Sequence, residues 1–193
     1  MLKEPSELKK WSEELRGDRR LVLYDHFGSM DDDDVINRIR YMAKGCDCKW
    51  VFVDHLSLII SGRDDGNERK AIDILMTKLR SLCHESKIGM LLACHLRRLD
   101  NDKGHEEGKQ VSLSHLRGSH SIAQLSDAVI GMERNQQDDD EIAKNTSTIR
   151  VLKNRYAGTT GVGSYLLYSA ENGRMTEIEN PFKENADEFE TQE

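Results

Sequence analysis

The amino-acid sequence predicts an α/β fold in which a mainly parallel, twisted sheet is flanked by helices. Apolar runs at residues 49–54 and 88–94 are each typical of a buried strand. Between them, apolar residues recur at spacings of three and four over residues 72–83, which predicts an amphipathic helix. Strand, helix and strand in this order form the pattern of a doubly wound sheet. The 193 residues suffice for one such domain.

Shorter elements are predicted on the N-terminal side of this unit. Residues 4–16 have the spacing of an amphipathic helix, and the apolar residues 21–24 predict a short buried strand. A cap signal at Ser29 predicts a helix over residues 29–42. The aspartates at 31–34 complement the dipole of its first turn, although a metal cluster is the alternative interpretation of such a run.

The C-terminal half predicts further strands and a long loop. Residues 128–132 form a third apolar run, and residues 148–153 and 164–168 predict a hairpin with turn residues between its strands. The polar stretch 96–114 is too long for a routine connection, which indicates a functional loop. We divide the chain into an N-terminal helix or linker (1–18), a main domain (19–179) and an acidic tail predicted to be disordered (180–193).

Composition excludes several classes of protein. The balance of 28 basic and 35 acidic residues, a net charge of −7, argues against a surface coated with basic charge for nucleic acid and leaves room for a local patch. No apolar run is long enough to cross a membrane and the first residues lack a signal-peptide core, so a cytoplasmic protein is predicted. The pairs Cys83-His84 and Cys94-His95 do not have the spacing of structural zinc sites, which favours reduced thiols.

Two polar residues follow the predicted parallel strands and are the first candidates for chemistry. Asp54 ends the first strand and His95 ends the second, and ligands of such sheets collect at the carboxyl ends of the strands. Asp54 could hold Mg²⁺, or it could cap the next helix. His95 could donate a hydrogen bond to a phosphate, or it could bond local backbone.

Basic residues form two further groups. Lys153 and Arg155 point to the same face near a glycine-containing turn, where they could neutralise charge on a transferred phosphoryl group or could be solvated surface charges. The long loop and its flanks have five basic and four acidic residues, a difference of +1, which is a weak footprint for nucleic acid. No G-x-x-x-x-G-K-[ST] phosphate-binding loop occurs in the 193 residues.

Several motifs occur together in the chain: KWVFVDHLSLII, LLACHLRR, HEEGKQVSLSHLRGS, QLSDAVIGMERNQQ and VLKNRYAGTTGVGSYLLY. In consistent order over about residues 20–170, they resemble the C-terminal helicase half of phage replicative primase–helicases, to which Twinkle and DnaB are more distantly related. The resemblance implies a RecA-like fold with a C-terminal β-hairpin, incomplete on its N-terminal side. It also implies a ring, usually a hexamer, that couples hydrolysis of a nucleoside triphosphate (ATP or dTTP, with Mg²⁺) to 5′ to 3′ translocation on single-stranded DNA and duplex unwinding.

The resemblance also implies roles for individual residues. Asp54 matches the Walker B carboxylate that holds Mg²⁺, His95 matches the residue that reads the γ-phosphate, and Gln124 lies in the motif that follows. Arg155 matches the arginine finger inserted into a neighbouring subunit's site. Positions bordering the nucleotide correspond to Arg134, Lys153 and Tyr168, and candidate contacts to DNA from the loop are Arg97, Lys103, Lys109 and Arg117.

Partners and activity follow from the same resemblance. A primase domain and a DNA polymerase are expected partners, the latter through an acidic tail in which Phe189 is the aromatic residue nearest the end, and the expected setting is a phage-infected or prophage-carrying bacterium. Because the phosphate-binding loop and the glutamate that activates water are not visible, this chain alone is expected to be inactive. The alternative is a module derived from a helicase that binds DNA or subunits and hydrolyses nothing.

Overall fold

The computed structural model describes residues 9–10, 13–14, 17, 21–24, 32–60, 68–97, 104–116 and 120–182. They form two compact units. The parallel unit contains the described residues from 9 to 97 together with 116 and 120–126, and the antiparallel unit contains residues 104–115 and 127–182. No helix within the described ranges is long and apolar enough to span a membrane.

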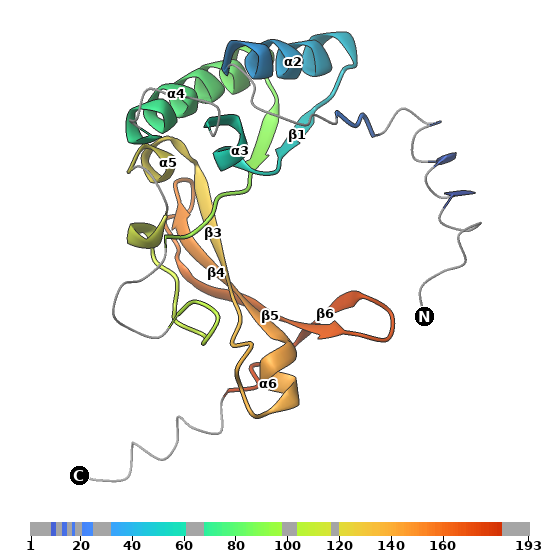
Figure 1. Cartoon of the computed structure of the whole chain (residues 1–193), viewed down its shortest axis with the longest axis vertical. Helices are drawn as coiled ribbons and strands as arrows, with labels where there is room; N and C mark the ends of the chain where they lie inside the picture. The colour runs from blue at the N-terminus through green and yellow to red at the C-terminus, as the bar shows by residue number, and fades with distance from the viewer. Residues whose placement is uncertain are drawn as a thin grey trace. The chain divides into compact units, whose positions relative to one another are not determined.

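The parallel unit has the predicted strand, helix and strand at its centre (Figure 1). Strands β1 (Trp50–Val53) and β2 (Gly89–Leu92) pair in parallel, with Val53 opposite Leu92, which confirms the expected pairing. The helices of this unit are α2 (Asp32–Gly45), α3 (Leu56–Ile60), α4 (Glu68–Ser86) and α5 (His120–Leu125). Helix α3 was not predicted from the sequence.

Helix α4 organises the hydrophobic core of the parallel unit. Its apolar residues recur every three or four positions, so they lie on one face, and Ile72, Leu75 and Leu82 are fully buried there. Helices α2 and α4 lie side by side (Figure 1), and Ile36 and Ile39 of α2 belong to the same core. The predicted amphipathic patterns therefore mark the faces that pack.

Strand β1 is covered on one face within the described structure. Val51 and Val53 point to the core, whereas Trp50 is 63% exposed and Phe52 is 73% exposed. Phe52 lies opposite Leu91 of β2, which is also exposed. The sequence predicted a central strand buried on both faces, and the second face is open because no described element packs over these three side chains.

The antiparallel unit is a four-stranded sheet in the order β3-β4-β5-β6. The predicted hairpin is confirmed as β4 (Thr146–Asn154) and β5 (Gly161–Ser169). Strand β3 (Ala128–Glu133) pairs with β4, and β6 (Arg174–Ile178), which was not predicted, pairs with β5. The mixed α/β fold is confirmed, but antiparallel pairing is more extensive than expected because β3 joins the hairpin rather than the parallel pair.

One predicted strand is wrong, and other predictions fall outside the described residues. Residues 21–24 form no strand and their apolar side chains are largely exposed, because no described strand supplies the hydrogen-bond partners that an extended tetrapeptide needs. Residues 9–10, 13–14 and 17 are helical and exposed. The predicted cap Ser29, Phe189 and most of the acidic tail lie outside the described ranges.

Candidate nucleotide and DNA site

Backbone hydrogen bonds join the carboxyl ends of β1 and β2 beyond the last paired residues. The N–H of Ala93 donates to the carbonyl of Val53 at 2.9 Å, and the N–H of Leu56 donates to the carbonyl of Ala93 at 3.0 Å. These bonds continue the parallel pairing into the turns that follow each strand. They hold Asp54 and His55, after β1, at the same edge of the sheet as His95, after β2.

Three polar residues, Asp54, His55 and His95, lie at this edge of the sheet, and we call them the strand-end cluster. Asp54 and His95 are exposed, whereas His55 is half-buried. The rings of His55 and His95 meet edge to face, with centroids 4.1 Å apart and an interplanar angle of 67°. The Nδ1 atom of His55 is buried and has no hydrogen-bond partner among the described residues. A buried polar atom in this state needs a partner from solvent or a ligand.

The chemistry of this cluster fits a phosphate held with Mg²⁺. An exposed carboxylate is the oxygen ligand that Mg²⁺ prefers, and an imidazole N–H is a donor suited to a phosphate oxygen. The unpartnered nitrogen of His55 adds a second polar atom at the same edge. Asp54 therefore offers one oxygen ligand for the expected Mg²⁺, and His95 offers a donor for the expected phosphate. Among the described residues, no group of three or more His, Cys, Asp or Glu side chains could hold a metal ion by itself.

The cysteine next to His95 is a packing residue. Cys94 packs against the hydrophobic core, and its thiol lies 4.0 Å from the carbonyl oxygen of Leu92. Burial raises the pKa of the Cys94 thiol to about 11. The thiol is therefore neutral at physiological pH and adds no charge beside His95.

The other predicted residues of the parallel unit lie on its surface. Gln124 is exposed on α5, and Arg97 is exposed immediately after an isolated bridge between Leu96 and Leu116. This bridge closes the base of the long loop. Lys103 and Arg117 lie outside the described residues.

The predicted arginine finger lies in the antiparallel unit, at the turn between β4 and β5. The guanidinium of Arg155 is paired with the carboxylate of Asp127 at 3.0 Å, and the Arg155 N–H donates to the Asp127 carbonyl at 2.8 Å. Half of the Arg155 side chain remains exposed. Lys153 is half-buried two residues earlier, opposite Val129 in the register, and Tyr168 is exposed on β5. The turn thus presents Arg155 while one carboxylate orients it.

Arg134, expected beside the nucleotide, is bonded to the end of a short helix. Helix α6 (Glu141–Asn145) begins with Asp140, whose carboxylate accepts a hydrogen bond from the N–H of Ala143 at 2.8 Å. At the other end, Arg134 donates to the carbonyl of Lys144 at 2.8 Å and to the side-chain oxygen of Asn145 at 3.1 Å. A cation at a helix C-terminus is favourable because the last carbonyls are unpaired and the dipole is negative there.

The family model of the DnaB-like helicase C-terminal domain matches residues 3–177. The chain belongs to this family. The match confirms the resemblance inferred from the motifs, and it covers both the parallel and the antiparallel unit.

Individual relatives agree with the family match. The DnaB-like chain is 39% identical over 170 residues to a DNA helicase/primase of Enterobacteria phage T3, covering 88% of this chain and 30% of that protein. It is 28% identical over 148 residues to a probable plasmid replicative DNA helicase of Chlamydia psittaci, covering 77% and 31%. The chain thus spans about a third of the length of these relatives.

A solved structure supports the fold. It is described as a DnaB-like replicative helicase and its interactions with primase, and it superimposes with a TM-score of 0.65 at 19% identity. The match covers 80% of this DnaB-like chain and 37% of the other. At this identity the likeness establishes the fold.

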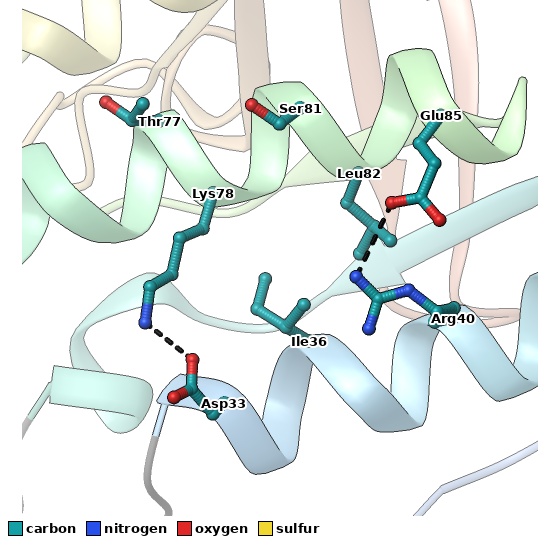
Figure 2. Close-up of a pocket in the computed structure, with 8 residues that line it drawn as sticks. All are labelled: Asp33, Ile36, Arg40, Thr77, Lys78, Ser81, Leu82 and Glu85. Atoms are coloured by element: carbon teal, nitrogen blue, oxygen red, sulfur yellow. Dashed lines mark hydrogen bonds and ion pairs between the residues drawn. The ribbon is translucent and has the colours of Figure 1, made fainter.

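A groove between α2 and α4 is lined by residues of these two helices and by none of Asp54, His55 and His95. Figure 2 shows its lining residues. The groove has a volume of about 310 Å³, with Ile36 and Leu82 among its lining residues. Its charged groups pair with one another: Lys78 with Asp33 at 2.6 Å and Arg40 with Glu85 at 3.5 Å. The pairing leaves the groove of this DnaB-like chain without a surplus of either charge for a phosphate.

Two further residues of this DnaB-like chain were not singled out from the sequence. His55 directly follows Asp54, so its position at the strand end was a usable signal. Glu133 ends β3 and binds Arg150, seventeen residues away in sequence, and no local pattern indicates such a pair.

Proposed function

We propose that this DnaB-like chain is the C-terminal part of a ring-forming helicase domain that couples nucleoside triphosphate hydrolysis to 5′ to 3′ translocation on single-stranded DNA. The observation that carries the proposal is the cluster of Asp54, His55 and His95 at the joined carboxyl ends of β1 and β2. Membership of the DnaB-like helicase C-terminal domain family supports it. This chain covers 30% of the phage T3 relative, so the activity of a whole helicase is part of the proposal.

In this proposal Asp54 holds Mg²⁺, which when bound neutralises charge on the transferred phosphoryl group. His95 donates a hydrogen bond to the terminal phosphate of ATP or dTTP. Because only Leu96 separates His95 from Arg97, a change at the phosphate reaches the base of the DNA loop through a short stretch of chain. Gln124, exposed on α5 of the same unit, assists this coupling.

Arg155 completes the site of a neighbouring subunit in this proposal. Its exposure at a tight turn suits insertion into another copy, and the Asp127 carboxylate fixes the direction of the guanidinium. Lys153, Arg134 and Tyr168 border the bound nucleotide, where an aromatic face suits a base. A residue that acts only in a neighbour's site requires assembly, so a closed ring, expected to be a hexamer, is part of the proposal.

The loop that follows His95 contacts single-stranded DNA through backbone phosphates. Arg97 is exposed at its base, and Lys109, Lys103 and Arg117 are the other proposed contacts. Phosphate contacts without base readout suit a motor that passes over any sequence. In a ring the small positive charge of each loop is repeated around a central channel, which raises its effect on DNA.

Replacing Arg155 tests the proposal. In a polypeptide that also carries a phosphate-binding loop, Arg155→Ala should reduce DNA-stimulated hydrolysis by about a thousand-fold or more while nucleotide binding is retained. The matched control is Arg174→Ala, which removes an exposed arginine at the start of β6 in the same unit. Unchanged turnover for Arg155→Ala would contradict the role of Arg155.

A second function is a binding module that holds DNA or other subunits without hydrolysis. The observation that favours it is that no G-x-x-x-x-G-K-[ST] motif occurs in these 193 residues. The two functions are separated by Mg²⁺-dependent hydrolysis, with and without single-stranded DNA, for this chain and for a polypeptide extended upstream. Activity only in the extended form supports the helicase, and activity in neither supports the binding module.

A further inference from the structure

A buried carboxylate at the end of β3 accepts three hydrogen bonds within the antiparallel unit. Glu133 is 8% exposed. Arg150 of β4 donates to it twice, from Nε at 2.6 Å and from its terminal nitrogen at 3.0 Å. The side-chain hydrogen bond with Glu133 raises the pKa of Arg150, which keeps the guanidinium charged. A two-bonded, largely buried pair of this kind is far more constrained than a surface ion pair.

The same carboxylate also binds the long loop. The backbone N–H of Val111 donates to Oε1 of Glu133 at 2.8 Å. Val111 is 2% exposed, and its side chain faces Gly131 of β3, where an added Cβ would come within 3.3 Å of it. Glu133 therefore joins three segments that are distant in sequence: the loop, β3 and β4.

The loop is fixed to the same segment at a second place. We call residues 104–115 the loop arm. Gln136 donates its N–H to the carbonyl of Glu106 at 2.9 Å, and Glu107 forms an isolated bridge with Asn135. The loop arm thus runs along residues 133–137, which follow directly from β3. Lys109, a proposed DNA contact, lies between the two attachment points.

We propose that Glu133 is a positioning residue that fixes the loop arm to strands β3 and β4 and so holds Lys109 in place for single-stranded DNA. The inference rests on the proposed function only in its DNA part. Strand β4 ends at the turn that carries Arg155, so the loop arm and the proposed arginine finger share one support. A shift of the loop arm on DNA then reaches that strand through a single carboxylate.

The contact with the loop arm is made by Glu133 and not by its partner Arg150. Arg150 neutralises the carboxylate, but the bond that reaches the loop arm is accepted by Glu133 itself. Without that acceptor, the N–H of Val111 would be buried without a partner, which costs more than the bond contributes when it is formed. The loop arm would then lose one of its two attachments while the sheet could remain paired.

Hydrogen exchange at the Val111 amide tests the attachment. Glu133→Gln changes the net charge by +1 and weakens the hydrogen bonds of residue 133 with Arg150 and Val111. Glu141→Gln makes the same change of charge on α6. We expect Glu133→Gln to lower protection of the loop-arm amides by about 10- to 100-fold. We expect Glu141→Gln to leave them unchanged. Equal effects of both variants would overturn the proposal.

A double variant keeps the test valid if Glu133→Gln unfolds. Replacing the pair together, Glu133→Leu with Arg150→Met, avoids an unpaired buried charge and should preserve the sheet. Glu133→Gln keeps one amide oxygen that can accept, whereas the double variant removes the acceptor of the Val111 N–H altogether. Protection at Val111 should therefore fall while protection of β4 and β5 amides is kept. Retained protection at Val111 would overturn the proposal.

Binding of a fluorescent oligo(dT) tests the DNA part, measured by anisotropy on the full chain. Both Glu133 variants should weaken binding at least five-fold, whereas Glu141→Gln should not. Loss of loop-arm protection with unchanged oligo(dT) affinity would overturn the positioning role. If the unaltered chain binds no oligo(dT), the proposed function of the loop fails, and with it the DNA part of this inference. Hydrogen exchange still decides whether Glu133 holds the loop arm.

Discussion

The ring of His55 meets the ring of His95 edge to face, with centroids 4.1 Å apart, at the joined ends of β1 and β2. His95 is exposed, whereas His55 is half-buried and lies between Val53 and Leu56, which both form backbone hydrogen bonds with Ala93. The orientation of the exposed imidazole therefore depends on the buried one. Any phosphate that His95 contacts would therefore meet an imidazole whose orientation is restricted by the contact with His55.

This dependence is testable by NMR of a histidine-labelled chain. His55→Phe keeps an aromatic ring and should leave the His95 ring protons near their original shifts, whereas His55→Ala should move them toward those of a free histidine. His55→Phe should not lower the free energy of unfolding, because it removes a buried nitrogen that has no partner among the described residues. His84→Ala, on exposed α4 surface, is the control. Identical His95 shifts in all variants would exclude the contact in solution.

The buried thiol of Cys94 should make stability depend on alkaline pH. Burial raises its pKa from 9.0 to about 11 in the folded chain, so the folded state holds the proton more tightly than the unfolded state. This contribution is fully present below pH 9 and is lost as the pH rises from 9 toward 11. Urea unfolding from pH 7 to 11, compared with Cys94→Ala, measures it. A difference between the two proteins that is constant over this range would contradict the prediction.

Gly108 should be the more sensitive of two glycines with positive φ. Its φ is +81°, and an added Cβ would lie 2.8 Å from the Cβ of Asn135, where the loop arm meets the segment after β3. Gly158 has a φ of +69°, and an added Cβ there would have no atom within 4 Å. Its substitution therefore measures the cost of the backbone conformation alone. We expect Gly158→Ala to cost about 1 kcal/mol and Gly108→Ala about 2 kcal/mol or more in urea unfolding. Equal losses would show that the contact with Asn135 is absent.

The open face of the parallel pair should control association. Trp50, Phe52 and Leu91 are exposed on one side of β1 and β2. We expect Phe52→Lys to reduce self-association in light scattering with little loss of stability, because the side chain is already in water. Val51→Lys, which buries a charge in the core from the adjacent position, should instead unfold the chain. Unchanged scattering for Phe52→Lys would show that this face does not drive association.

Local periodicity predicted the elements that pack by one face. Helix α4 was predictable because each of its buried residues recurs at helical spacing, and β1 and β2 because each is a short apolar run next to turn signals. Residues 21–24 have the same apolar character as β1, but a strand also needs a partner, which local sequence does not specify. The pairing of β3 with β4 was not predictable for the same reason.

The candidate site divides in a similar way. Asp54 and His95 were predictable because the ends of parallel strands meet at one edge, and the chain order places a polar residue at each end. Glu133 and Arg150 meet only after three segments are assembled, so their relationship depends on tertiary structure. The roles assigned to Arg134, Lys153, Arg155 and Tyr168 remain predictions from resemblance.

The two hydrogen bonds from Arg134 to the end of α6 set up a competition. A guanidinium has a limited number of donors, and those that bind the carbonyl of Lys144 and the side chain of Asn145 are not available to a nucleotide at the same time. A nucleotide that used the same two of the five N–H donors would therefore compete with the last turn of α6, and stabilising that turn would weaken such binding by an equal factor. The C-terminal end of α6 and a nucleotide would thus compete for the same hydrogen-bond donors of Arg134.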